Sequence, residues 1–543
     1  MIGTVKTFSA LTEEFVECVL RYDPVYATFV GIHDYDHRLP NDSPDGFRER
    51  SAWLRDLEQR LVASVPWEEL PPPQRIDYAL LRSRIASMRA DVEEIKVQTR
   101  HAAMYPEIAL RGIHIILARP FAPLEERKES IIARLMAIPD YLTAAQANLT
   151  RIPELFIELA TEVTATGPDF VDQTARELIE SFPGERERIE EAARRARMGF
   201  LQYLDFLEHD ARSRIGGTFA IGERWMNFKL EREHLLPMNC VALDAFGRDH
   251  VEKTRALLEA AAKKHDPAKT WRELVAETRQ RHPEPGKLRE AYAAEVARAR
   301  KFVEEKRLAP IPQGQLEIVD TPAFERPTTP FASYLQPGPF DEDATGYFFV
   351  TPVDTTRKKD VQEEQIRAHN YTALSLTAVH EAWPGHHLQL LHALNAGSRL
   401  RRLADSPVFA EGWALYCEEL MFEQGFHVEP LTRVHQLKDL LWRACRVVID
   451  VGLQTGKMSF AEAVDYLVEQ AMLERASAEV EVKRYTHAPT QPMSYLVGKH
   501  QLLEIRDEMK KRKGAKFNLY DFHKALLGCG TVPPALARME LEA

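Results

Sequence analysis

The stretch that most constrains the fold of this chain holds three histidines and one glutamate within eight residues, His380-Glu381-Ala382-Trp383-Pro384-Gly385-His386-His387. It follows an apolar run typical of a helix. This density of imidazole indicates a metal site, but Pro384 occupies the position of the second histidine in the common H-E-x-x-H zinc motif. On a straight helix, His386 and His387 would lie about 9 and about 10.5 Å from His380. Since zinc–nitrogen bonds are about 2.0–2.1 Å long, a shared metal requires an interrupted helix.

Pro384-Gly385 is a pair suited to that interruption. Proline has no N–H to donate to the carbonyl one turn earlier, and glycine tolerates backbone angles that other residues avoid. Two extruded residues would bring His386 back to the face of His380, and three would bring His387. We predict His386 as the ligand, with His387 as the alternative. The simpler alternative is a helix that ends at Pro-Gly, with surface histidines beyond it.

A second stretch supplies a candidate third ligand, Glu411, which lies 31 residues after His380. It reads as a helix, because Phe409, Trp413 and Tyr416 form an apolar stripe at helical spacing. Zinc hydrolases with a His₂Glu site take their third ligand from a glutamate on a later helix. We therefore predict one Zn²⁺ per chain. The alternative for Glu411 is a solvated side chain in a first helical turn.

The two stretches resemble the H-E-x-x-P-G-H-H and E-G-W-A-x-Y patterns of a bacterial family, domain of unknown function 885, which is grouped with the gluzincin metallopeptidases. The resemblance covers most of the chain, from Asp23-Pro24 to residues 530–533, and includes residues 443–450 and 481–485. Two positions depart from the pattern: Thr490 stands where glycine is expected, and Gln454 where histidine is expected.

The resemblance implies a zinc-dependent hydrolase of peptide or amide bonds. Glu381 would take a proton from water activated by the metal and pass it to the leaving amine. Gluzincins commonly place a tyrosine or histidine late in the chain, where it donates to the oxyanion of the tetrahedral intermediate. Tyr495 and Tyr485 match those family positions, and we predict them as catalytic residues.

Candidate substrate-binding residues lie in two places. Tyr347, Phe348 and Phe349 precede the metal stretch, and gluzincins bind the substrate backbone by strand addition to an edge strand there. A plain structural strand is the alternative. Near the late tyrosines, Arg484 and Lys499 are candidates for a substrate carboxylate. A solvated surface position is the alternative for each cation. His487 is a further candidate for a substrate contact.

The pattern predicts a mainly α-helical chain, and the resemblance implies a two-lobed gluzincin-like fold. Proline and glycine gather in 308–356, where short β-like runs at 315–319 and 347–350 indicate a small sheet beside the active-site cleft. We predict a helical lobe at 1–306 and a catalytic lobe at 307–543. The latter would hold the sheet (307–356) and the zinc-site helices (365–543).

Composition narrows the partners and the compartment. A net charge of −11 argues against a nucleic-acid surface. No apolar run is long enough to span a membrane, and the first ten residues lack the apolar core of a signal peptide. The five scattered cysteines form no disulfide framework. We therefore expect a cytoplasmic protein that acts on a peptide or small amide, and the oligomeric state stays open.

Two other functions fit the same residues. One is an amidase that acts on a non-peptide substrate with the same metal. The other is a zinc-binding helical scaffold without turnover. Glu381 argues against the scaffold, because a structural zinc site needs no general base and is usually rich in cysteine.

Overall fold

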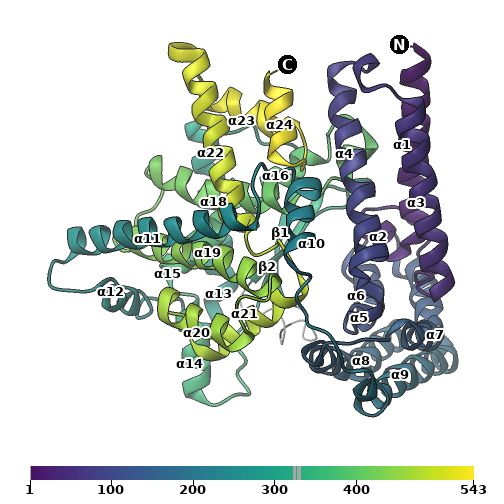
Figure 1. Cartoon of the computed structure of the whole chain (residues 1–543). Helices are drawn as coiled ribbons and strands as arrows, with labels where there is room; N and C mark the ends of the chain where they lie inside the picture. Colours follow the sequence, from purple (N-terminus) through teal and green to yellow (C-terminus); the bar gives the residue numbers. More distant parts are fainter. Residues whose placement is uncertain (1, 322–325, 327–331, 543) are drawn as a thin grey trace. The chain divides into compact units, whose positions relative to one another are not determined.

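A computed structural model describes residues 2–321, 326 and 332–542, and the chain is mainly helical with one small three-stranded sheet (Figure 1). This confirms the predicted mainly α-helical class with a small sheet. The chain divides into two compact units. The first unit holds Met1–Ile221 together with Gly338–Asp343, and the second holds Gly222–Pro337 together with Ala344–Ala543.

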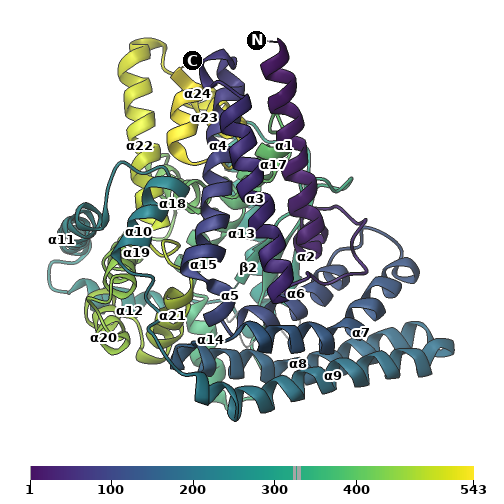
Figure 2. The ribbon, with the colours of Figure 1, turned by 45° about the vertical axis from the view of Figure 1, so that its right-hand side comes forward.

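The first unit is built from helices alone within its described residues. Figure 2 shows its three longest helices, α7, α8 and α9, running side by side. Glycine permits their close approach, since a Cβ at Gly199 would lie 2.9 Å from the Cα of Pro139. The helices are α1 (Ile2–Tyr22), α2 (Pro24–Phe29), α3 (Pro44–Ser64), α4 (Pro72–Arg89), α5 (Val97–Arg100), α6 (Met104–Ala118), α7 (Leu124–Asn148), α8 (Glu154–Ser181) and α9 (Arg186–Glu208).

The second unit begins well before the boundary predicted at 306/307, because the long helix α11 packs along α19. Its helices are α10 (Glu223–Phe228), α11 (Cys240–His265), α12 (Trp271–Thr278), α13 (Leu288–Lys306), α14 (Lys359–Ala368), α15 (Tyr371–Glu381), α16 (His386–Ala393), α17 (Arg399–Arg402), α18 (Pro407–Glu423), α19 (Thr432–Gln454), α20 (Phe460–Ala471), α21 (Arg475–His487), α22 (Ser494–Lys513), α23 (Leu519–Gly528) and α24 (Pro534–Glu542).

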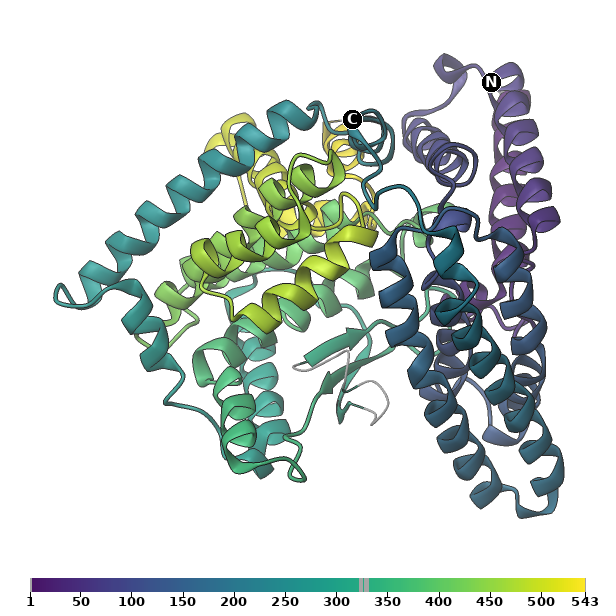
Figure 3. The same ribbon diagram turned by 60° about the horizontal axis from the view of Figure 1, so that its bottom comes forward.

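The sheet of the second unit consists of β1 (Gln315–Asp320), β2 (Ala332–Leu335) and β3 (Thr345–Val350), in the order β1-β3-β2 (Figure 3). Strand β3 pairs in parallel with β1 and antiparallel with β2. The runs predicted at 315–319 and 347–350 are thus strands, whereas β2 was not predicted.

The expected edge position of Tyr347, Phe348 and Phe349 is wrong. These residues lie on β3, whose backbone pairs with a strand on both sides, so β3 has no free edge for an added substrate strand. Phe348 is fully buried and packs against Tyr292 of α13, with ring centroids 5.4 Å apart. It therefore serves the core of the unit.

A close approach of α18 and α22 positions the late tyrosine relative to Glu411. A Cβ at Gly412 would lie 2.5 Å from the Cα of Gly498, so only glycine permits this contact. The sequence next to Glu411 thereby brings the start of α22 against α18. None of the helices in the described residues combines the length and the apolar character needed to cross a bilayer.

Candidate metal centre

The helix that carries His380 is interrupted where the sequence predicts it. Helix α15 ends at Glu381 and α16 begins at His386, and the Trp383–Pro384 peptide bond between them is cis. The N–H of Gly385 donates to the carbonyl of Val379 at 3.0 Å, a bond across six residues instead of the usual four. Two residues are therefore extruded, the number that returns His386 to the face of His380.

Neighbouring groups hold this interruption in place. A Cβ at Gly385 would collide with the carbonyl oxygens of His380 and Val379, so the turn requires glycine at this position. The carbonyl of Pro384 accepts a hydrogen bond from the indole Nε1 of Trp413 at 2.8 Å. That tryptophan belongs to α18, the helix that also supplies Glu411, so one helix supports both parts of the site.

The structure brings His380, His386 and Glu411 together. One ligand atom from each lies within 4.8 Å of the others. The Oε2 atom of Glu411 is 3.2 Å from Nε2 of His386 and 3.6 Å from Nε2 of His380. Two ligands about 2.1 Å from a tetrahedral zinc are about 3.4 Å apart, so these distances fit a shared ion.

The orientation of Glu411 also fits a cation. Its Oε2 atom is buried and, within the part of the chain that the structure describes, accepts no well-directed hydrogen bond despite its closeness to both imidazoles. An orphaned buried carboxylate oxygen is costly unless a positive group satisfies it. Two histidines and one carboxylate are a donor set typical of catalytic Zn²⁺.

A carboxylate that the sequence did not single out orients the first histidine. Nδ1 of His380 pairs with Oε1 of Glu418 at 2.9 Å, which leaves Nε2 to face Glu411. Burial alone lowers the pKa of His380, but Glu411 and Glu418 outweigh it and raise that pKa to about 10. Glu418 lies seven residues after Glu411, on the same face of α18, and that spacing could have identified it.

His387, the alternative ligand, points away from this cluster. Its Nδ1 pairs with the hydroxyl of Tyr334 on β2 at 2.8 Å, and its ring meets the edge of Trp383. Burial lowers the pKa of His387 to about 3, so it is neutral. His387 therefore joins the interrupted helix to the small sheet.

The predicted general base, Glu381, is the last residue of α15 and is half-buried. It is adjacent to His380 in the chain, and its charge also acts on the hydroxyl of Tyr292. The charge of Glu381 acts on the neighbouring His380. Glu381 is not one of the three converging groups, His380, His386 and Glu411.

The two predicted tyrosines have different environments. The ring of Tyr495 stacks on His380, with centroids 6.3 Å apart. Burial and the nearby Glu411 raise the pKa of Tyr495, so its hydroxyl keeps its proton at neutral pH. In contrast, the hydroxyl of Tyr485 donates to Oε2 of Glu481 at 2.6 Å. Tyr485 is thus already engaged within α21.

The predicted cationic substrate contacts also differ in environment. Nζ of Lys499 pairs with Glu419 at 3.2 Å and is buried. Arg484 donates to Glu481 at 2.8 Å. Burial lowers the pKa of His487 to about 4, so this imidazole is neutral. The structure brings none of the three into the His380 cluster.

The two departures from the family pattern support the loop before Tyr495. Thr490 has φ +69°, the left-handed region in which glycine is ordinarily favoured. Its N–H donates to the buried Asp450 at 3.2 Å, and its hydroxyl pairs with His234. Gln454 donates to the carbonyls of Tyr485 and Thr486. Both positions thus act on backbone geometry.

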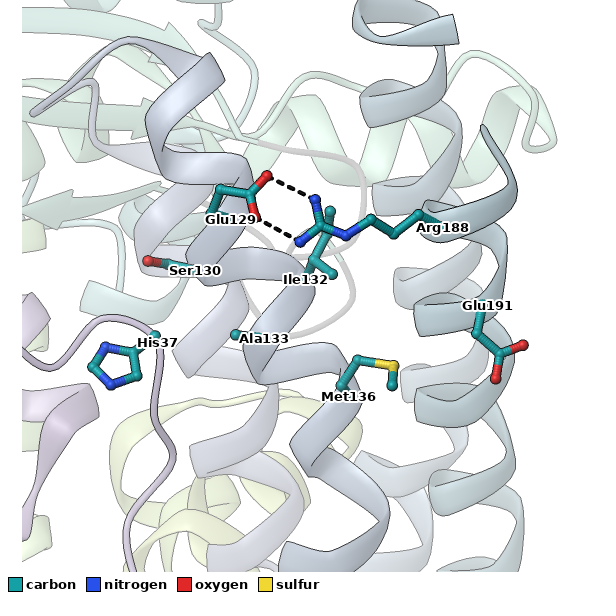
Figure 4. A pocket seen from close by; sticks show the side chains of 8 residues that line it. All are labelled: His37, Glu129, Ser130, Ile132, Ala133, Met136, Arg188 and Glu191. Atoms are coloured by element: carbon teal, nitrogen blue, oxygen red, sulfur yellow. Dashed lines mark hydrogen bonds and ion pairs between the residues drawn. The ribbon is translucent and has the colours of Figure 1, made fainter. Parts of the chain in front are cut away.

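A cavity of about 530 Å³ lies elsewhere, in the first unit, between α7, α9 and the loop that carries His37 (Figure 4). An ion pair between Glu129 and Arg188 links the two helices there, with nitrogen and oxygen 2.6 Å apart. The residues around it hold no converging set of histidines and carboxylates, so this cavity is not the candidate metal centre.

The chain belongs to the family described as "Bacterial protein of unknown function (DUF885)", whose pattern matches residues 24–541. It matches none of the curated proteins. Solved structures of other proteins share its fold. A "putative lipoprotein of unknown function" from Shewanella oneidensis is 24% identical, with a TM-score of 0.81, and the match covers 99% of this chain and 100% of that one.

The second structure is a "putative lipoprotein" from Colwellia psychrerythraea, which is 18% identical with a TM-score of 0.86. That match covers 100% of this chain and 99% of the other. These descriptions overturn the expectation of a cytoplasmic protein, since both similar structures are described as lipoproteins. The absence of a spanning segment, on which that expectation relied, does not exclude attachment through a lipid.

Proposed function

We propose that this chain is a zinc-dependent hydrolase that cleaves peptide or amide bonds, and that its fold is a two-lobed variant of the gluzincin metallopeptidases. The observation that carries the proposal is the convergence of His380, His386 and Glu411 beside a further carboxylate, Glu381. A structural zinc site needs no such base, so the fourth group favours catalysis over a scaffold.

The three converging residues would hold the ion, with His380 oriented by Glu418. A bound Zn²⁺ supplies a Lewis acid that activates water and polarises the scissile carbonyl. Glu381 takes the proton of the attacking water and delivers it to the leaving amine. Because Tyr495 is protonated and stacked on His380, its hydroxyl is available to donate to the developing oxyanion.

The proposal is tested by metal analysis together with a substrate panel. Purified protein is expected to carry about one zinc per chain and to hydrolyse short peptides, with loss of activity in chelator and recovery on addition of Zn²⁺. Hydrolysis of non-peptide amides alone would assign the amidase reaction. Bound zinc without turnover of any amide would leave a scaffold, and activity that persists in chelator would contradict the proposal.

A further inference from the structure

A cluster of arginines lies next to Tyr495, the residue whose ring also stacks on His380. Arg443 and Arg446 are one turn apart on α19, and Arg484 lies on α21. Nη2 of Arg446 and Nη2 of Arg484 reach the same oxygen of Glu481, at 3.0 and 2.8 Å. The hydroxyl of Tyr485 donates to that oxygen as well. One carboxylate oxygen therefore accepts from two guanidinium groups and one hydroxyl, and it does not reach Arg443.

In the described part of the chain, the guanidinium groups of Arg443 and Arg446 have donors without a hydrogen-bond partner. Nε and Nη1 of Arg443, and the same two atoms of Arg446, are buried and have no hydrogen-bond partner among the described residues. The side chain of Arg446 is only 3% exposed. Asp439, one turn before Arg443, is already paired with Lys438 at 3.1 Å. Buried charged donors without partners are costly, so the protein retains an unfilled capacity for an anion here.

Aromatic rings fix the two guanidinium groups. The Cζ atoms of Arg443 and Arg446 lie 4.4 and 4.3 Å from the ring centroid of Trp442. The same two atoms lie 5.7 and 4.7 Å from the ring centroid of Tyr495. Because the rings cover their faces, both planar forks are held in place, and a fixed fork is the geometry that matches a carboxylate.

The position of the cluster relates it to the candidate metal centre. The ring of Tyr495 contacts both the guanidinium of Arg446 and the imidazole of His380. The arginines are therefore one aromatic ring away from a predicted metal ligand. One or two extended peptide residues span about 3.5–7 Å. A group one or two residues beyond a bond cleaved at the metal can therefore reach the arginines.

We infer that Arg443 and Arg446 form a subsite for a substrate carboxylate one or two residues beyond the scissile bond. The carboxylate is either the free C-terminus of a short peptide or an acidic side chain at that position. The inference rests on the proposed function, because that function places the scissile bond at the metal centre. The binding of a carboxylate to the arginines is a separate property.

The kinetic test compares matched substrates on the full chain. Two peptides share one neutral sequence, one with a free C-terminus and one with a C-terminal amide, and a third is the amide with one residue after the scissile bond replaced by an acidic residue. Wild type is expected to favour at least one carboxylate peptide over the neutral amide, and Arg443→Gln to lower kcat/KM for that peptide about 10–100-fold, mainly through KM. Rates on the neutral amide are expected to change little.

Two further variants distinguish the effect of the planar guanidinium of Arg443 from the effect of a positive charge alone. Arg443→Lys keeps the charge but loses the fork, and is expected to recover only part of the affinity. Arg475→Gln removes one positive charge from the exposed surface of α21, where Arg475 pairs with Asp465, and is expected to behave as wild type. Equal losses in Arg475→Gln and Arg443→Gln would overturn the inference, as would equal wild-type rates on all three peptides. The peptide whose hydrolysis Arg443→Gln slows, either the one with a free C-terminus or the one with an acidic side chain, shows which carboxylate the arginines bind.

A binding measurement keeps this inference distinct from the proposed function. Calorimetry is done with Glu381→Gln, using an N-acetyl amino acid as probe and its amide as the reference. Tighter binding of the acid that disappears with Arg443→Gln supports the subsite even if no peptide is cleaved. Hydrolysis by wild type without any preference for the acid would leave the proposed function intact and refute the subsite. Thermal melts confirm that each variant is folded.

Discussion

Each unit of this chain holds a partly buried group of histidine and carboxylate side chains, whose imidazoles are more deeply buried in the second unit than in the first, and the two groups are built differently. In the first unit, Nδ1 of His33 pairs with Asp36 at 2.9 Å, and its Nε2 faces Asp341 at 3.4 Å. Asp36 also accepts from the hydroxyl of Thr28, and Asp341 from the N–H of Gly338. The imidazole lies between two carboxylates, and each carboxylate also accepts from a local donor, while Nε2 of His33 and Oδ1 of Asp341 have no well-directed hydrogen bond among the described residues.

In the second unit, two imidazoles and one carboxylate turn their free atoms toward one point. Glu411 Oε2 lies close to both His380 and His386 but has no well-directed hydrogen bond among the described residues. Both clusters therefore keep buried atoms without a well-directed hydrogen bond, but within the described part of the chain only the second brings three possible ligand atoms within 4.8 Å of one another. Histidine and acidic residues in one place therefore do not define a metal site; the convergence of three ligand atoms on one position does.

The largest expected effect comes from removing a carboxylate of the second cluster. Glu381→Gln should retain zinc but lower kcat about 10²–10⁴-fold, because the proton acceptor is lost while the ligands remain. Glu411→Gln should lower the zinc content itself. The corresponding change in the first unit, Asp36→Asn, should keep zinc and activity and reduce only thermal stability. Elemental analysis, kinetics and melts on the three variants test the comparison, which fails if Asp36→Asn loses zinc.

The next effect concerns the hydroxyl of Tyr495. Tyr495→Phe keeps the ring that stacks on His380 and removes a single donor to the oxyanion. We expect kcat to fall about 10²–10³-fold with little change in KM or zinc content. Tyr485→Phe is the matched control, because its hydroxyl is engaged with Glu481, and its kinetic effect should be smaller. A larger loss in Tyr485→Phe would exchange their roles.

A smaller effect is expected for the residue that orients His380. Glu418→Gln keeps a hydrogen-bond acceptor near Nδ1 but removes the negative charge. Zinc affinity should fall about 10–100-fold, the usual cost of losing such a support. Competition with a chromogenic chelator measures this directly. Glu423→Gln is the control, since Glu423 lies on the same helix and pairs instead with Arg506. Equal zinc affinities in both variants would remove Glu418 from the site.

The local parts of the site could be predicted from the sequence, and the parts that depend on packing could not. The break at Pro384-Gly385 follows from the missing N–H of proline and the freedom of glycine, both properties of single residues. The spacing of Glu418 places it on the face of Glu411, but its pairing with His380 exists only when α15 packs against α18. The central position of β3 depends on β2, a strand of four residues whose pairing is not encoded locally. The same limit concealed Arg443 and Arg446, whose partners lie on other helices.

The smallest expected effect tests the first cluster through its pH dependence. Burial lowers the pKa of His33, but Asp341 and Asp36 outweigh it and raise that pKa to about 9. An unfolded histidine titrates near 6.5. Since the folded pKa is the higher one, the stabilisation from His33 is fully present below about pH 6.5 and is lost as the pH rises through 9.

The His33 side chain is 30% exposed, and solvent screens its ion pairs, so we expect a contribution of about 1–2 kcal/mol. Urea unfolding of wild type and His33→Gln between pH 6 and 9.5 measures it, because all other titrating groups are shared and cancel in the difference. The stability advantage of wild type should shrink across this range. His265→Gln, at the exposed end of α11, should show no such trend. A constant difference between wild type and His33→Gln would mean that the carboxylates do not hold a proton on His33, and the two clusters would no longer differ in the way their charges are balanced.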